Sequence, residues 1–167
     1  EWDMIKSYRK ITIVRNPWDL MVSWYWFCTF IYPESSSHKI RWPKITNEDD
    51  PETVIKKFEV FLIDRYTKNF NHPVKSLYTS NPIDYVVMRS ASAYPHPYID
   101  TYLRFENLQR TYTRAFRKLG VPKHTLAHIK SNYRTLPLHY SCYYNDTTRD
   151  LVSEKFQDWI KMFDYKF

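Results

Sequence analysis

An arginine separates a short apolar stretch from the start of a predicted helix in KITIVRNPWDLMVSWYWF (residues 10–27). The guanidinium of Arg15 offers a planar set of N–H donors that matches phosphate oxygens. The N–H groups at the start of the following helix add partial positive charge. Ser23 follows Arg15 by eight residues and can donate a hydroxyl if its helical turn faces the same pocket. These residues therefore predict an anion-binding site.

A purely structural role for the same residues is the alternative. Arg15 would then pair with Asp19 or Glu106, and Ser23 would only pack against its neighbours. The residue types alone leave both possibilities open.

The elements around Arg15 would position it at a sheet edge. Residues 11–14 are apolar and largely β-branched, which predicts a buried strand. Asn16 can cap the next helix, Pro17 suits its first position, and the helix should end before Pro33. In open α/β sheets, ligands bind at the carboxyl ends of the strands, where Arg15 would lie.

Further elements alternate along the chain. Strands are predicted at 83–90 and 101–107, and residues 33–50 are predicted to be a surface loop. Helices are predicted from Asp50, over residues 107–119 with Gly120 as the stop, and from about Thr147 with Asp146 or Thr147 as the cap. The apolar residues expected to be buried in these helices are Val54, Ile55, Phe58, Phe61, Leu62, Leu108, Tyr112, Ala115, Phe116, Leu119, Leu151, Val152, Phe156, Trp159, Ile160 and Phe163.

The length of 167 residues predicts a single α/β domain, with a short sheet flanked by helices. Aromatic residues make up 19% of the chain, which argues against disorder over most of it. The net charge of +7 favours anionic partners, although solubility alone would also explain it. Cys28 and Cys142 are expected to be free thiols, and no metal site or membrane-spanning segment is predicted.

The stretch IVRNPWDLMVSWYWF resembles the 3′-phosphate-binding motif of sulfotransferases that use 3′-phosphoadenosine 5′-phosphosulfate (PAPS). That motif is a strand, Arg-Asn-Pro-x-Asp, a Ser eight residues after the Arg, and then x-Tyr. The stretches TYLRFENLQRTYTRAFRKLGVP and HYSCYYNDTTRDLVSEKFQDWIKMFDYKF resemble two later segments of the same family. The likeness covers residues 1–27 and about 101–167, in the family's order.

This resemblance implies a P-loop-NTPase-like sulfotransferase fold in which Arg15 and Ser23 bind the 3′-phosphate of PAPS. Leu20 departs from the pattern, because a basic residue is common there. A larger departure is that nothing before Arg15 fits the family's 5′-phosphosulfate-binding loop, which contains Lys and Gly-Thr or Gly-Ser. The chain is therefore expected either to be the C-terminal part of a longer domain that has a further first strand, or to be a degenerate relative.

The reaction that the resemblance implies is sulfonate transfer from PAPS to a hydroxyl acceptor, with adenosine 3′,5′-bisphosphate as the second product and no metal. A base near the acceptor is needed, and His96 and Glu106 are weak candidates. In similar proteins a loop closes over the nucleotide where Lys130, Ser131 and Arg134 lie here, so these three are further candidate cofactor contacts.

Three functions remain open from the sequence. The first is a PAPS-dependent sulfotransferase acting on a carbohydrate or another hydroxyl acceptor. The second is a non-catalytic relative that binds the nucleotide or another anion. The third is a basic nucleic-acid-binding module, which is disfavoured because the positive charge looks scattered and no nucleic-acid motif is present. The visible chain suits the cytoplasm, with the Golgi lumen as the alternative if an N-terminal anchor precedes it.

Overall fold

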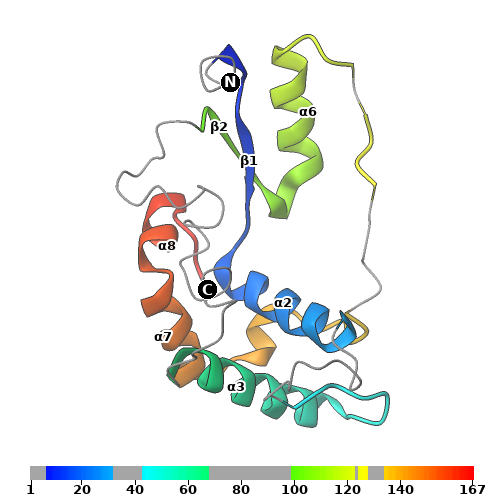
Figure 1. Ribbon diagram of the computed structural model, residues 1–167, viewed down its shortest axis with the longest axis vertical. Helices are drawn as coiled ribbons and strands as arrows, with labels where there is room; N and C mark the ends of the chain where they lie inside the picture. Colours follow the sequence, from blue (N-terminus) through cyan, green and yellow to red (C-terminus); the bar gives the residue numbers. More distant parts are fainter. Residues whose placement is uncertain (1–6, 32–42, 68–98, 123, 128–133) are drawn as a thin grey trace. The chain divides into compact units, whose positions relative to one another are not determined.

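The computed structural model describes residues 7–31, 43–67, 99–122, 124–127 and 134–167 (Figure 1). These residues fall into two compact units. The first contains the described residues up to Asn16 and those within 82–129, and the second contains the described residues within 17–81 and 130–167. The described residues contain both helices and parallel strands, so the chain is of the α/β class, as the sequence predicts. No helix in the described ranges has the length and apolar character needed to cross a membrane.

The first unit contains a two-stranded parallel sheet. Strand β1 (Ile11–Val14) pairs with β2 (Thr101–Arg104), in a register that aligns Ile11 with Thr101 and Val14 with Arg104. Lys10 and Asp100 extend this pairing, because the amide of Lys10 donates to the Asp100 carboxylate (2.7 Å) and the amide of Asp100 donates to the Lys10 carbonyl (2.9 Å). The parallel register brings the carboxyl ends of both strands to one edge.

The predicted strand at 101–107 is correct only as far as Arg104. Residues Phe105–Asn107 form a short 3-10 helix, η1, that leads directly into α6 (Leu108–Lys118). Helix α6 contacts β2, so the chain reverses at η1 and returns along the strand that it has just left. The reversal ends the strand pairing although the sequence there stays compatible with a strand.

Helix α6 ends as the sequence predicts. Gly120 has a φ of +73°, which is the left-handed conformation that glycine adopts most readily. The amide of Val121 donates to the Phe116 carbonyl (3.0 Å) and the amide of Gly120 to the Arg117 carbonyl (3.1 Å). These two bonds define a Schellman motif. The apolar face of α6 is less buried than the sequence predicts. Leu119 is 45% exposed and no residue of the helix is fully buried, because its main contacts among the described residues are only the short elements β2 and η1.

The second unit is helical and has an aromatic core. It contains α2 (Pro17–Ile31), α3 (Pro51–Thr67), a 3-10 helix η3 (Tyr140–Tyr143), α7 (Asp146–Lys155) and α8 (Gln157–Phe163). Both α2 and α3 begin at the predicted prolines, and Val54, Phe58, Phe61 and Leu62 of α3 are buried as predicted, whereas Ile55 is half-buried. Rings from α2, α3 and η3 meet around Phe58, and the indole of the buried Trp26 donates to the Tyr143 hydroxyl (3.2 Å).

The C-terminal helix differs from the prediction in its cap and in its continuity. Asn145, not Asp146 or Thr147, caps α7, because its side chain accepts from the amide of Thr148 (2.9 Å) while the Thr148 hydroxyl accepts from the amide of Asn145 (3.1 Å). The helix is interrupted at Phe156, whose φ of −116° and ψ of 20° are not helical. Val152, Phe156 and Trp159 are nevertheless buried as predicted.

We expect Asn145→Ala to lower the free energy of unfolding by about 1 kcal/mol, the usual cost of removing an N-cap. The substitution also removes the hydrogen bond from the Asn145 amide to Glu59 of α3 (2.9 Å). Urea denaturation of the wild type, Asn145→Ala and Asn145→Ser measures the effect. Asn145→Ser keeps a capping oxygen without placing a second carboxylate beside Glu59, and it should retain most of the stability; equal losses in both variants would contradict the capping role.

The predictions for the two cysteines and for part of the 33–50 loop agree with the structure, and two others fall outside the described residues. Both cysteines are free thiols, Cys28 buried and Cys142 exposed, as expected. Within the predicted loop 33–50, residues 43–50 contain no helix or strand, which fits the prediction. The remainder of that loop and the predicted strand at 83–90 lie outside the described residues.

Candidate functional site

Arg15 is placed by the end of β1. Since Val14 aligns with Arg104 in the parallel register, the next residues of the two strands, Arg15 and Phe105, emerge at the same edge. The guanidinium carbon of Arg15 lies 4.2 Å from the centroid of the Phe105 ring. Such a cation–π contact contributes about 0.5–1 kcal/mol at an exposed site. It uses the face of the guanidinium, whereas the N–H donors that bind phosphate lie in its plane.

Glu106 acts on the start of helix α2. Its Oε1 accepts a hydrogen bond from the backbone amide of Asn16, the residue directly before the helix. The Asn16 residue is only 6% exposed, so this bond satisfies an amide that is shielded from water. The sequence did not predict this contact with the residue before α2. Pro17 has no N–H, so any helix amides offered to an anion begin at Trp18.

Ser23 and Asp19 lie on one face of α2, four residues apart in the second unit. Ser23 is half-buried. The carboxylate of Asp19 pairs with Arg134, whose Nη1 lies 3.3 Å from Oδ1. The structure therefore brings Arg134, a candidate cofactor residue, to the helix face that carries Ser23, another such candidate.

Arg134 is held by several groups of the second unit. Besides its ion pair with Asp19, it donates from Nη2 to the carbonyl of Leu138, and its guanidinium carbon lies 5.3 Å from the centroid of the Tyr143 ring. Its buried Nε has no hydrogen-bond partner among the described residues. Two of the guanidinium nitrogens of Arg134 thus already bind groups of the second unit, Nη1 the Asp19 carboxylate and Nη2 the Leu138 carbonyl.

Three of the candidate site residues are not part of the described structure. Lys130 and Ser131, the other candidate cofactor contacts, and His96, a candidate base, lie outside the described residues. Glu106, the second candidate base, is described and exposed; its contact with a substrate stays a prediction.

No family model, curated protein or solved structure matches this chain. The resemblance to PAPS-dependent sulfotransferases therefore stays a prediction. What the structure shows is an α/β chain in which an arginine follows a parallel strand and directly precedes a helix region.

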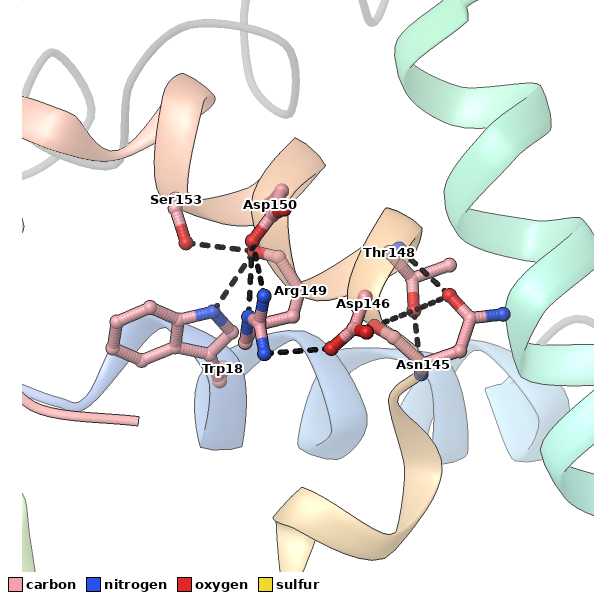
Figure 2. A network of polar contacts seen from close by, with 7 residues as sticks. All are labelled: Trp18, Asn145, Asp146, Thr148, Arg149, Asp150 and Ser153. Carbon is pink, nitrogen blue, oxygen red and sulfur yellow. Dashed lines mark hydrogen bonds and ion pairs between the residues drawn. The ribbon is translucent and has the colours of Figure 1, made fainter.

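The contacts that fix the first turn of α2 are not indicated by the local sequence pattern. Trp18, the second residue of the helix, donates from its indole Nε1 to the carbonyl of Arg149 (3.2 Å), as Figure 2 shows. Its own carbonyl accepts from the Tyr144 hydroxyl (2.8 Å), and its ring lies 5.5 Å from that of Phe167. Burial raises the pKa of Tyr144 well above its ordinary value, so the phenol keeps its proton and donates.

Arg149 supports this arrangement from helix α7. Its guanidinium donates to Asp146 (2.7 Å) and to Asp150 (2.9 Å), and its carbonyl accepts from both Trp18 and Ser153 (Figure 2). The hydrogen bond with Asp150 leads the causes that raise the pKa of Arg149. The three groups are exposed enough for water to screen them, so the ion pairs orient the side chain more than they stabilise the fold.

The sequence did not indicate the position of Phe105, because it predicts a strand that continues to residue 107. In the structure Arg15 directly follows β1 and Phe105 directly follows β2, and these parallel strands end at a shared edge. The pairing of Asp19 with Arg134 spans 115 residues and likewise has no signal in the local pattern of either segment.

Proposed function

We propose that this chain is a sulfotransferase domain that binds PAPS and transfers its sulfonate group to a hydroxyl acceptor, with a carbohydrate as the expected acceptor class. Arg15 and Ser23 would bind the 3′-phosphate of the nucleotide, and Lys130, Ser131 and Arg134 would contribute further contacts. The fold that goes with this function is the P-loop-NTPase-like sulfotransferase fold.

The observation that carries the proposal is the position of Arg15. It follows a parallel strand, precedes the start of α2, and has its guanidinium carbon 4.2 Å from the centroid of the Phe105 ring. A cation at a strand end next to a helix start is the arrangement that binds phosphate in many α/β proteins. Glu106 accepts from the Asn16 amide, so this amide is not offered to the phosphate and the proposed contact rests on the Arg15 guanidinium.

Sulfonate transfer would proceed by in-line displacement, with requirements similar to those of phosphoryl transfer. The acceptor oxygen forms a bond to sulfur while the bond between sulfur and the bridging oxygen of PAPS breaks. The acceptor proton passes to a base, for which His96 and Glu106 are the candidates, and adenosine 3′,5′-bisphosphate leaves. The protein would contribute positioning of the nucleotide through its 3′-phosphate, which is distant from the reacting bond.

Nucleotide binding is the first test. Thermal unfolding of the chain is measured with adenosine 3′,5′-bisphosphate and, as the matched control, with adenosine 5′-monophosphate, which lacks the 3′-phosphate. We expect the bisphosphate to raise the melting temperature and the monophosphate to raise it much less, since a ligand that binds only the folded state stabilises it in proportion to its affinity.

Transfer is tested separately with labelled PAPS and a panel of hydroxyl acceptors. Labelled product would support the full proposal, whereas bisphosphate binding without transfer would favour the non-catalytic relative that binds the nucleotide. No 3′-phosphate-dependent stabilisation would refute both.

A further inference from the structure

The positive charge of the chain is concentrated in one segment. Residues 107–145 contain seven Lys and Arg residues and no Asp or Glu, and the remainder of the sequence is electrically balanced. The whole net charge of +7 therefore resides in less than a quarter of the chain. Basic residues occur along the whole sequence, but only in residues 107–145 are they not balanced by acidic residues.

Helix α6 carries most of this charge in an ordered form. Arg110, Arg114 and Arg117 follow each other at spacings of four and three residues, which places them on one face of a helix, and Lys118 adjoins them. We call these four residues the cationic stripe. All four are exposed. Along the helix axis the three arginines span about 10 Å, at 1.5 Å per residue.

The local structure does not offset this charge. Helix α6 contains no acidic residue, and no side chain of the cationic stripe forms an ion pair or hydrogen bond with another described residue. Glu106, four residues before Arg110, instead accepts from the Asn16 amide. Arg110 and Arg114, four residues apart, repel each other, and Arg110 in the first turn opposes the helix dipole, whereas Arg117 and Lys118 lie in the last turn, where the dipole favours cations. No acidic side chain among the described residues neutralises the cationic stripe.

The segment after the helix is fixed beside it. The side chain of Gln109 donates to the carbonyl of His124 (3.0 Å) and accepts from the amide of Leu126 (2.8 Å). This pair of bonds attaches residues 124–126 to the first turn of α6. Helix α6 and its following segment therefore present a defined surface within the first unit.

We propose that the cationic stripe binds a linear sulfated polysaccharide. Arginine is well suited to sulfate because its planar donors can contact two oxygens at once. Single-stranded nucleic acid is disfavoured, because single strands are bound by stacking on aromatic side chains, whereas duplex DNA, whose phosphates and guanines arginine also binds, is distinguished from the polysaccharide by experiment. The aromatic residues of α6, Tyr112 and Phe116, stack on each other with centroids 4.2 Å apart, and Gln109 is engaged with the backbone. This surface does not depend on the proposed transfer reaction.

Binding of heparin at several salt concentrations tests the proposal, with the same polysaccharide after desulfation and duplex DNA as comparison ligands. The variant is Arg110→Gln, Arg114→Gln and Arg117→Gln together. The matched control is Lys155→Gln, Lys161→Gln and Lys166→Gln, which removes the same charge from exposed positions of the second unit. We expect the first variant to weaken heparin binding at least tenfold, with a shallower salt dependence, and the control to change it less than threefold.

Several outcomes would overturn this inference. Equal weakening in both variants would show that net charge alone attracts the polysaccharide. Equal binding of heparin and of its desulfated form, or DNA binding as tight as heparin binding, would exclude the proposed ligand class. Folding is monitored by thermal unfolding, and the stripe variant should melt close to the wild-type temperature, because removal of the repulsion between Arg110 and Arg114 opposes the loss of the favourable Arg117 charge in the last turn. The single variant Arg114→Gln, with a smaller expected loss, keeps the test valid if the triple variant unfolds.

Discussion

Arg15→Ala should weaken the binding of adenosine 3′,5′-bisphosphate by roughly 30- to 150-fold. The proposed contact is a charge-assisted hydrogen bond to a doubly charged phosphate, and such bonds contribute about 2–3 kcal/mol. The loss should be confined to the 3′-phosphate, so binding of adenosine 5′-monophosphate should change little. Isothermal titration calorimetry with both nucleotides measures the two affinities in the wild type and the variant.

Two further variants make this result specific. Arg15→Lys keeps the charge but loses the planar fork, and we expect it to restore only part of the affinity. Arg9→Ala is the matched control, because this arginine lies in the same unit, with a side chain that is 70% exposed and 3.6 Å from Asp100. If Arg9→Ala weakened binding as much as Arg15→Ala, the nucleotide would be responding to general charge and the assignment of Arg15 would be wrong.

Phe58→Ala should lower the free energy of unfolding by about 3–5 kcal/mol, the usual cost of truncating a fully buried phenylalanine. Phe58 has no exposed surface, and its ring contacts those of Tyr25, Phe61 and Tyr144, with centroids 5.6, 6.2 and 5.1 Å away. In a chain of this size such a loss lowers the melting temperature by roughly 6–20 °C. Thermal and urea unfolding followed by circular dichroism measure both quantities.

Val60→Ala on the same helix is the control for Phe58. Val60 is 47% exposed, so its truncation should change the unfolding free energy by less than about 1 kcal/mol. Similar small effects of both substitutions would mean that the aromatic cluster around Phe58 is not the core of the second unit. Phe58→Leu, which restores much of the volume, should recover part of the loss.

The elements nearest to the candidate site were predictable because local signals agree there. β-Branched residues define β1, proline at the first position defines the starts of α2 and α3, and Gly120 ends α6 through a conformation that suits glycine. The break at Phe156 had no such signal, since apolar spacing continues through it into α8. Phe156 is buried, and tertiary packing of a buried residue can override local helix propensity, which a periodic pattern does not express.

The sequence predicted which residues form the candidate site, but few of their contacts. The types and spacing of Arg15 and Ser23 predict an anion, which stays a prediction, and the bond from the Asn16 amide to Glu106 was not predicted. The Phe105 ring under Arg15 depends on strand register, and the Asp19–Arg134 pair joins segments 115 residues apart. Contacts of this kind are set by how the chain folds back on itself, so a single sequence does not specify them.

The aromatic contact between Trp18 and Phe167 restricts how the chain can be shortened. A boundary drawn after α8, at residue 163, looks safe because the regular structure ends there. It would remove the ring that covers one side of the indole, together with a neighbour of Tyr140 and Tyr144. Water would then reach the beginning of α2 from that side, so engineered truncations intended to keep this helix start intact must retain the final aromatic residue.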